Sequence, residues 1–453
     1  MFNKTPFYLF ATYIVTFGNS IVLSSASAQI TTDGSTNTNL TPTDTGVQID
    51  DGDRAGGNLF HSFGEFSVPN GSEAFFNNAS DIVNIFSRVT GGNISNINGL
   101  IRANGTANLF LINPAGILFG EGASLQIGGS FYGSTADSIL FPDGEFSATN
   151  LDNPPLITIN APIGLGFRDN PEPIVNRSFV RNDAGDFVGL SVQPGNTLGL
   201  VGGNINFEAG EATAPGGNIF LGSLSEAGEV GINDDGSLSF PEDVERADIN
   251  LTNAADVDVR GTGGGSITVN ARNLSLTAGE SSRSFLRAGI TADSTSPNAT
   301  AGDISVNVTE NLTLDDSSIG NRVAPFGVGN SGNINIVTDS LFATNGAQVS
   351  ASTNGIGNAG SVEIIASDTI NINRDNSDTP TGVFSRVNSD GEGNAGGVTI
   401  STANLNLTNG AQVSASTNGI GNAGSVEIIA SDTINLDGDN PDTVTGVFSQ
   451  VNS

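Results

Sequence analysis

Pairs of carboxylates are the residues of this sequence best suited to chemistry. Asp256 and Asp258 alternate along one strand-like run, and Asp315 and Asp316 are adjacent in another. Two carboxylates brought together by a fold can act as acid and base on a glycosidic bond. Neighbouring coils of a repetitive β-fold can supply such a pair at any sequence spacing. These residues and Glu363 are therefore the candidates for a polysaccharide hydrolase or lyase.

Other features of the sequence weigh against catalysis. Glu363 recurs as Glu427 inside a perfect internal repeat, which indicates a structural residue on an outer face. Lyases commonly use Lys or Arg to stabilise an anionic intermediate, and the only lysine, Lys4, lies in the N-terminal leader. With no credible catalytic constellation in view, we expect no enzyme and no cofactor.

The single histidine, His61, lies beside Phe60 and Phe63, and we interpret it as a packing residue. Zinc and redox-metal sites are improbable because the chain has no Cys and no His cluster. A Ser-His-Asp triad would have to use His61, and the sequence has no nucleophile-elbow motif. The glycine-rich run 261–265 lacks a dinucleotide-binding pattern and precedes a strand, so it is predicted to be a turn.

Three acidic turns raise the alternative of calcium binding: residues 234–236, 375–378 and 437–442. None has the full spacing of an EF-hand or of a nonapeptide calcium repeat. We expect hydrated loops, with calcium as the open alternative.

Residues 1–28 are typical of a secretory signal peptide. Lys4 supplies the basic start, residues 7–17 the apolar run, and Ala26-Ser27-Ala28 the small-residue site, so cleavage is predicted between Ala28 and Gln29. The alternative is an uncleaved N-terminal membrane anchor. Cleavage leaves 453 − 28 = 425 residues with no Cys, so disulfides cannot stabilise the mature chain.

The mature chain is strongly acidic. All 47 Asp and Glu lie after residue 28, against 14 Arg, so its formal charge is 14 − 47 = −33. This charge argues against nucleic acid and against unassisted binding to anionic lipid, and it suits the solubility of a long extracellular rod.

Short strands separated by Gly and Asn turns follow one another through residues 84–130. The expected strands are residues 84–89, 99–103, 109–112 and 117–119. Asn113-Pro114-Ala115-Gly116 has the residue order of a type I turn, and Ile117 opens the next strand.

The segment NLFLINPAGILFG (residues 108–120) resembles the Asn-Pro-Asn-Gly-Ile motif of the two-partner secretion domain, which opens exoproteins of the filamentous haemagglutinin family. The order and spacing of NLFHSFGEFSV (58–68), FFNNASDIVNIFSRVTGG (75–92) and GGSFYGSTADSILF (128–141) agree. Two positions depart from the family pattern: Ala115 replaces the usual Asn, and Asn77-Asn78 replaces a common Asn-Pro. The resemblance implies a right-handed β-helix and an outer-membrane β-barrel transporter with periplasmic docking domains as partner. It also implies a secretion motif at Asn113, Pro114, Ala115, Gly116 and Ile117.

The rest of the chain repeats. A Gly, a polar residue and alternating β-branched residues recur, as in GSITV at Gly265 and GSVEI at Gly360, and residues 345–371 recur unchanged at 409–435, a shift of 64. A unit of about three strands cannot bury its apolar face alone, whereas stacked units can, with Ile, Val and Leu inward and Asn, Ser and Thr outward. We therefore predict an all-β parallel β-helix of about 20–28 residues per coil, or roughly 15–20 coils. Asparagines are expected to form ladders between coils.

The predicted domain plan has three parts. Residues 29–169 form the secretion domain, opening with a cap at 29–57 that contains a strand at 47–50. A Pro-rich passage, with an expected strand at 156–159, places the boundary near Asp169. Residues 170–453 form a repeat shaft, which ends part-way through a repeat and so suggests truncation at the C-terminus.

The first hypothesis is accordingly a secreted or cell-surface exoprotein, exported across the outer membrane as an adhesin-like or haemagglutinin-like rod. Its surface partners would be host-cell or surface glycans or proteins. The alternative is a secreted β-helical polysaccharide hydrolase or lyase.

Overall fold

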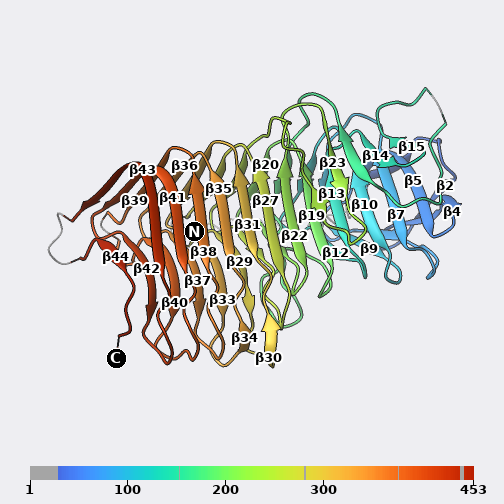
Figure 1. Ribbon diagram of the computed structural model, residues 1–453. Helices are drawn as coiled ribbons and strands as arrows, with labels where there is room; N and C mark the ends of the chain where they lie inside the picture. The colour runs from blue at the N-terminus through green and yellow to red at the C-terminus, as the bar shows by residue number, and fades with distance from the viewer. Residues whose placement is uncertain (1–28, 153, 280–281, 376, 439–442, 453) are drawn as a thin grey trace, which may run out of the picture.

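A computed structural model describes residues 29–152, 154–279, 282–375, 377–438 and 443–452. These residues form an elongated stack of coils with no helix, so the predicted all-β parallel β-helix is confirmed (Figure 1). The handedness stays a prediction. The predicted signal peptide lies outside the described residues, and so does Ala28 of the predicted cleavage site. In the part of the chain described, no helix is long and apolar enough to cross a membrane.

Three parallel faces run along the stack. The first face consists of β5 (Asn58–Ser67), β7 (Asn84–Val89), β10 (Asn108–Ile112), β13 (Phe131–Ser134), β19 (Thr197–Gly202), β22 (Asn218–Ser223), β27 (Ser266–Ala271), β31 (Ile304–Val308), β35 (Ile334–Thr338), β38 (Val362–Ala366), β41 (Val398–Thr408) and β43 (Val426–Asp437). The second face consists of β8 (Ser95–Ile97), β11 (Ile117–Phe119), β17 (Ile174–Asn176), β20 (Ile205–Glu208), β25 (Ile249–Thr252), β28 (Leu274–Thr277), β32 (Asn311–Asp315), β36 (Ser340–Thr344), β39 (Thr369–Asn373) and the second halves of β41 and β43.

The third face begins with β3 (Gly46–Asp51), β6 (Glu73–Phe76), β9 (Leu100–Ala103) and β12 (Ser124–Gln126). It continues with β18 (Leu190–Ser191), β21 (Glu211–Thr213), β26 (Asp256–Asp258), β29 (Phe285–Ile290), β33 (Ser318–Val323), β37 (Gln348–Thr353), β40 (Gly382–Val387), β42 (Gln412–Thr417) and β44 (Gly446–Phe448). A two-stranded outgrowth is formed by β30 (Thr295–Thr300) and β34 (Val328–Asn330).

The register of the first face explains the long sequence repeat. Val362 pairs with Val398, and Val398 pairs with Val426, so two successive coils of 36 and 28 residues make up the shift of 64. Twelve described strands follow one another on this face, so the predicted 15–20 coils were too many. Several coils are longer than predicted: Ile267, for example, pairs with Ile304, 37 residues later. Part of the chain also lies outside the coils, as in the side sheet described below.

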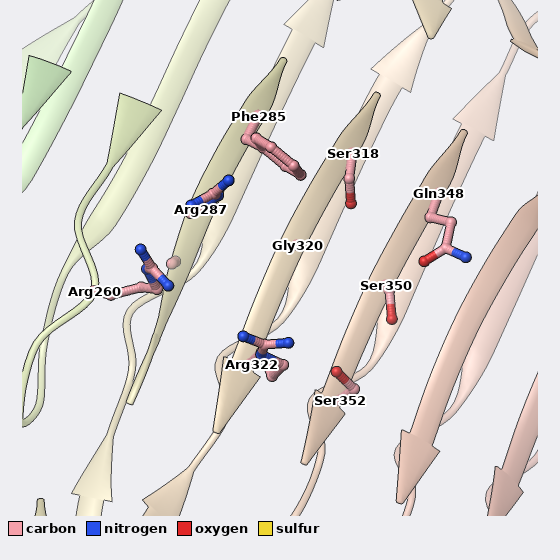
Figure 2. A pocket seen from close by; sticks show the side chains of 10 residues that line it. Arg260, Phe285, Arg287, Ser318, Gly320, Arg322, Gln348, Ser350 and Ser352 are labelled. Carbon is pink, nitrogen blue, oxygen red and sulfur yellow. The ribbon is translucent and has the colours of Figure 1, made fainter. Parts of the chain in front are cut away.

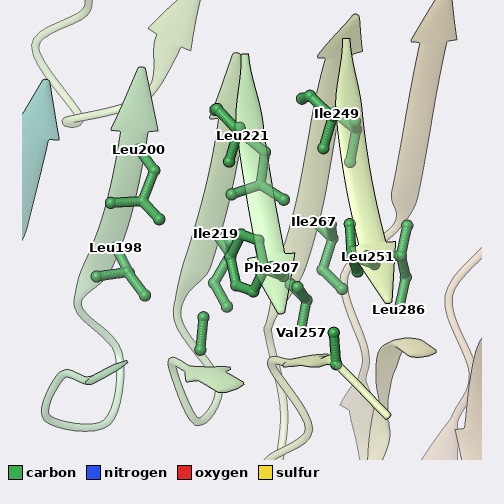
Figure 3. Packing of buried hydrophobic residues seen from close by; sticks show 14 of the residues in the cluster. Leu198, Leu200, Phe207, Ile219, Leu221, Ile249, Leu251, Val257, Ile267 and Leu286 are labelled. Carbon is green, nitrogen blue, oxygen red and sulfur yellow. The ribbon is translucent and has the colours of Figure 1, made fainter. Parts of the chain in front are cut away.

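The interior is filled by aliphatic side chains stacked from coil to coil (Figure 3). Leu198, Ile219 and Ile267 occupy one column of the first face, and Ile249 extends the corresponding column of the second. All four are completely buried. Each buried aliphatic side chain contributes about 1.5–3 kcal/mol relative to exposure, so these columns supply the main stabilisation of the stack.

Steric crowding requires the glycine that opens each repeat unit. A Cβ on Gly360 would lie 1.9 Å from the carbonyl oxygen of Gly332 in the preceding coil, and a Cβ on Gly424 would lie 1.9 Å from that of Gly396. Successive coils approach so closely at this corner that no side chain fits.

Residues 29–57 close the N-terminal end as a cap. Strand β1 (Gln29–Thr32) pairs antiparallel with β5, and β2 (Thr38–Pro42) forms an antiparallel hairpin with β3, which contains the predicted strand at 47–50. Strand β4 (Asp53–Ala55) also pairs antiparallel with β5. The predicted cap is therefore present, and it covers the otherwise unpaired edge of the first coil.

The prediction that only polar residues point outward fails near the cap. Phe60, Phe86, Phe110 and Tyr132 form an outward row on the first face, with neighbouring ring centroids 5.1, 5.1 and 4.4 Å apart. A five-stranded antiparallel side sheet covers them, built from β14 (Ser138–Phe141), β15 (Gly144–Ser147), β16 (Gly164–Phe167), β23 (Gly228–Ile232) and β24 (Leu238–Ser239). This side sheet lies against the N-terminal coils (Figure 1).

The predicted strand at 156–159 was wrong: these residues are not in a strand. The neighbouring prolines 154, 155 and 162 have no N–H to donate to a ladder. The carbonyls of Thr158 and Asn160 instead accept hydrogen bonds of 3.0 and 2.8 Å from Nδ2 of Asn58.

An asparagine ladder crosses the first coils, as predicted. Asn84 donates to Asn58 over 3.0 Å, Asn108 donates to Asn84 over 3.0 Å, and Oδ1 of Asn108 accepts from the backbone N–H of Ser130 over 2.9 Å. Each amide thus uses one group toward each neighbouring coil.

Replacing Asn84 with Ala removes the middle of this ladder and leaves Oδ1 of the buried Asn58 and Nδ2 of the half-buried Asn108 without their ladder partners. We expect the free energy of unfolding to fall by about 1–3 kcal/mol, measured by denaturant titration. Asn39→Ala on the exposed side of β2 is the control and should have little effect. Equal stability of the two variants would contradict a structural role for the ladder.

Candidate functional site

The predicted turn at residues 113–116 joins the first and second faces between β10 and β11. The backbone N–H of Gly116 donates to the carbonyl of Asn113 over 3.0 Å, and the N–H of Ala115 donates to Oδ1 of Asn113 over 2.9 Å. Gly116 has φ +110°, a value that favours glycine. The turn thus has the hydrogen bonds that its residue order predicts.

Asn113 fastens this turn to the preceding coil. Its side chain is fully buried, and Nδ2 donates to the carbonyl of Asn93 over 3.0 Å and to Oγ of Ser95 over 2.8 Å. Its backbone N–H donates to the carbonyl of Ser134 in the following coil over 2.9 Å. One asparagine therefore fixes the turn relative to the coils on both sides.

Only part of the motif is accessible from outside. Pro114 and Ala115 are partly exposed, whereas Asn113, Gly116 and Ile117 are buried. Ile94 is 43% exposed, and its side chain lies beside Gly116, since a Cβ built there would be 3.5 Å from Cδ1 of Ile94. The surface of the motif is therefore small and apolar.

Arg88, which sequence reasoning missed, locks three parts of the N-terminal region together. It is 2% exposed, and it donates to Oγ of Ser62 over 2.8 Å, to Oγ of Ser35 in the cap over 3.0 Å, and to the carbonyl of Ser147 in the side sheet. Its guanidinium lies 4.6 Å from the ring centroid of Phe146. A lone arginine inside the apolar run NIFSRV was the available signal.

The charge of Arg88 is balanced by Asp33 in the cap. Oδ2 of Asp33 accepts hydrogen bonds from Ser62 over 2.6 Å and from Thr90 over 2.9 Å. Burial would raise the pKa of Asp33, but these bonds and those from Ser35 outweigh it and hold the pKa below its usual value. Burial lowers the pKa of Arg88, opposed by the charge of Asp33.

His61 is a packing residue, as predicted. It is 1% exposed, its Nδ1 lies 3.0 Å from Oγ1 of Thr38, and its ring packs against those of Phe63 and Phe76. Burial lowers the pKa of His61 to about 3, so the ring is neutral at physiological pH. It joins the cap to the first coil.

Asp256 and Asp258 come together with an acid that the sequence did not reveal. Asp256 lies opposite Glu211 of the neighbouring coil, a contact visible only once the register is known. Asp256 pairs with Arg287 at 3.1 Å, and Asp258 pairs with Arg260. Burial, with a smaller effect of Asp258, raises the pKa of Asp256 to about 7, and burial likewise raises the pKa of Glu211 to about 7.

The other candidate carboxylates lie elsewhere. Asp315 is on the second face, where it accepts from Oγ1 of Thr344 over 3.0 Å, and Asp316 pairs with Arg283 at 2.6 Å. Glu363 and Glu427 are exposed in one column of the first face, with Thr399 between them, as expected of outer-face residues. The structure therefore does not join the two aspartate pairs into one site.

The acidic turns do not gather further ligands. In the described part of the chain, no group of three or more His, Cys, Asp or Glu side chains is placed to hold a metal ion. Asp235 instead accepts a hydrogen bond of 2.9 Å from the backbone of Ser237. The turns 375–378 and 437–442 lie partly outside the described residues.

The fold is a β-helix with a capped first coil, and comparison with a family model shows the class of protein to which it belongs. Residues 28–269, just over half of the chain, match the family model described as the TPS secretion domain. The chain belongs to this family, and it is a two-partner secretion exoprotein. No curated protein matches it.

Two solved structures are similar. The HMW1 secretion domain from Haemophilus influenzae is 17% identical, with a TM-score of 0.56 over 94% of this chain and 98% of that chain. The filamentous hemagglutinin secretion domain is 14% identical, with coverage of 90% and 99%, and its TM-score of 0.32 is too low to support an argument. The family model and the HMW1 structure are both described as secretion domains.

The buried carboxyl of Asp256 should make stability depend on pH. The raised pKa means that the folded protein keeps a proton between about pH 4 and pH 7 that the unfolded chain releases. The protonated carboxyl thus contributes stability at low pH that is lost as the pH rises toward about 7. The difference between the Tm of Asp256→Asn and the Tm of the wild type should therefore increase by about 1–3 °C from pH 4 to pH 7, measured by differential scanning fluorimetry. A constant Tm difference over this range would contradict the raised pKa.

Proposed function

We propose that this protein is exported across the outer membrane through a β-barrel transporter whose periplasmic docking domains recognise its N-terminal domain. The observation that carries the proposal is the family match together with the fixed turn at residues 113–117. The exported protein would reach the cell surface or the medium, where a formal charge of −33 keeps a long rod soluble.

The recognition surface would lie within residues 58–141 and centre on the secretion motif. Buried Asn113 holds the turn to the coils on both sides, so Pro114 and Ala115 are presented at a fixed place beside Ile94. Pro114 restricts φ and Gly116 permits the exit of the turn, so little conformational entropy remains to be lost on docking. The family's usual Asn at position 115 is not needed to close this turn.

The domain plan remains part of the proposal, with residues 29–169 as the recognised domain and 170–453 as the shaft. The shaft would carry an adhesive surface outward from the recognised domain. The adhesin role is the more specific part of the proposal, and it does not depend on how the chain is exported.

The test compares variants of the motif for docking and export. Asn113→Ala with Pro114→Ala should weaken binding to the periplasmic domains of the transporter, measured by surface plasmon resonance, at least tenfold while circular dichroism stays native. Ala115→Lys alters only the partly exposed surface and should also weaken docking. The transporter is best sought in the neighbouring reading frame.

A matched control exists in the same family-matched region. Asn182 opens another Asn-x-x-Gly turn, in which Gly185 donates to the carbonyl of Asn182 over 2.9 Å. Asn182→Ala should dock and be exported like the wild type. A folded double variant at 113 and 114 that does the same would remove this motif from the recognition surface and leave it a structural turn.

A further inference from the structure

Two hollows on the outside of the third face share four corresponding lining residues. The first has a volume of about 320 Å³, and its lining includes Arg322 of β33 with Gln348, Ser350 and Ser352 of β37. The second has a volume of about 430 Å³, and its lining includes Arg386 of β40 with Gln412, Ser414 and Ser416 of β42. These four pairs of residues are each 64 positions apart, so the internal repeat has duplicated this part of the lining, while the rest of each lining differs.

The arginine in each hollow lacks an acidic partner. In the described part of this strongly acidic chain, Arg260 and Arg287 pair with Asp258 and Asp256, whereas no carboxylate lies within ion-pairing distance of Arg322 or Arg386. Displaced water and the positive charges of Arg260 and Arg287 lower the pKa of Arg322, and burial lowers the pKa of Arg386 to about 10. Both remain charged at neutral pH, so each hollow presents an uncompensated cation.

The remaining lining suits a ligand rich in hydroxyl groups. Figure 2 shows Arg260, Arg287 and Arg322 at one side of the first hollow, with Ser318 on the same strand as Arg322 and with Gln348, Ser350 and Ser352 on the next strand. Nε2 of Gln348 donates to the carbonyl of Pro380 over 2.7 Å, which holds the amide in place, and Gln412 donates likewise to Val444 over 3.2 Å. Phe285 adds a partly exposed ring over which the guanidinium of Arg287 lies at 3.7 Å.

The floor of the first hollow is open because of Gly320. A Cβ added there would meet nothing closer than Oγ of Ser318 at 3.7 Å and the carbonyl of Ser350 at 3.9 Å. The glycine is therefore not required by close packing, and a side chain at this position would occupy the space of the hollow itself.

The spacing of the two cations limits the class of ligand. Arg322, Ser352 and Arg386 are paired in one column, so the two arginines are two strand spacings apart, roughly 9.6 Å. This is about the length of a disaccharide in an extended polysaccharide. A nucleic acid carries its charges far more densely, and the acidic remainder of the protein would repel it.

We propose that the third face binds a linear acidic oligosaccharide, with Arg322 and Arg386 each holding one carboxylate or sulfate group two sugars apart. Gln348, Ser350 and Ser352, on the strand between the two arginines, hydrogen-bond the sugar hydroxyls between the two anionic groups. Planar guanidinium groups can engage either anion through two parallel hydrogen bonds. The proposal deepens the adhesive role suggested above, but it does not depend on the route of export.

The test measures binding of the purified mature chain to a hexasaccharide that alternates N-acetylglucosamine and glucuronate, by isothermal titration calorimetry at low salt. A chondroitin sulfate hexasaccharide forms the sulfate arm, a hexamer of N-acetylglucosamine is the neutral ligand, and single-stranded DNA is the polyanion. At least one acidic sugar should bind, and more tightly than the neutral ligand and the DNA; the tighter of the two acidic sugars identifies the anion. Failure of both acidic sugars to bind, or equal binding of the neutral ligand or of DNA, would overturn the proposal.

Variants locate the site. Arg322→Ala should raise the Kd at least about tenfold, as expected for the loss of a charge-assisted pair. Arg177→Ala, which removes the same charge from an exposed arginine paired with Glu208, should leave it unchanged. Gly320→Leu should weaken binding without any change of charge. An Arg322→Ala or Gly320→Leu variant that binds like the wild type would place the ligand elsewhere and overturn the assignment.

Ligand length tests the duplication. A hexasaccharide that spans both hollows should bind more tightly than a disaccharide, and Arg386→Ala should abolish most of that gain. Equal affinity for the two lengths would overturn the two-hollow arrangement. Export of Arg322→Ala should match the wild type, so loss of binding and loss of secretion are separate results.

Discussion

In-register stacking of parallel coils is the constraint on which the rest of this structure depends. Each coil offers its backbone and its inward side chains to the next, so a column such as Leu198, Ile219 and Ile267 is continuous only if the register is kept. A slip of one residue would turn these aliphatic side chains outward and bring polar ones inside. The asparagine ladder and the close contact at Gly360 act on the same register from the corners. The stack is thus stabilised by nearest-neighbour contacts, and each coil depends on the one beside it.

The first coil of the stack has no preceding coil to pair with, so its outer edge would present unpaired backbone N–H and C=O groups. The cap supplies strands on that side, and Arg88 joins cap, coil and side sheet through Ser35, Ser62 and Ser147. Because this arginine is buried, breaking any one of its bonds exposes an imperfectly compensated charge. The proposed secretion motif therefore lies on coils whose end is closed by the cap, where the turn around Asn113 keeps a fixed orientation relative to its neighbours.

Local pattern was enough to predict most strands and the motif turn. The expected strands at 84–89 and 117–119 coincide with β7 and β11, because alternation and turn residues are encoded within a few positions. The side sheet was missed because its strands come from segments about sixty residues apart and cover aromatic residues such as Phe86 that alternation alone assigns to the outside. The pairing of Glu211 with Asp256 was missed for a similar reason: it exists only through a register that spans 45 residues.

Comparison of the two copies of the long repeat shows which residue positions are constrained by stacking and which are not. Between β33 and β40 the inward Ile319 and Val383 are both aliphatic, and the outward Arg322 and Arg386 are both cations, whereas the position of Gly320 is filled by Phe384. Inward positions must fit the column, so duplication can change little there. An outward arginine contributes nothing to the inner columns, and in the described part of the chain eight of the fourteen arginines pair with a carboxylate. Arg322 and Arg386 pair with no carboxylate among the described residues, and Arg386 instead stacks on the ring of Phe384 at 3.4 Å. The ligand proposed above would account for both cations, and because the next copy of this position is Gln450, the two arginines form one pair of charges on the rod.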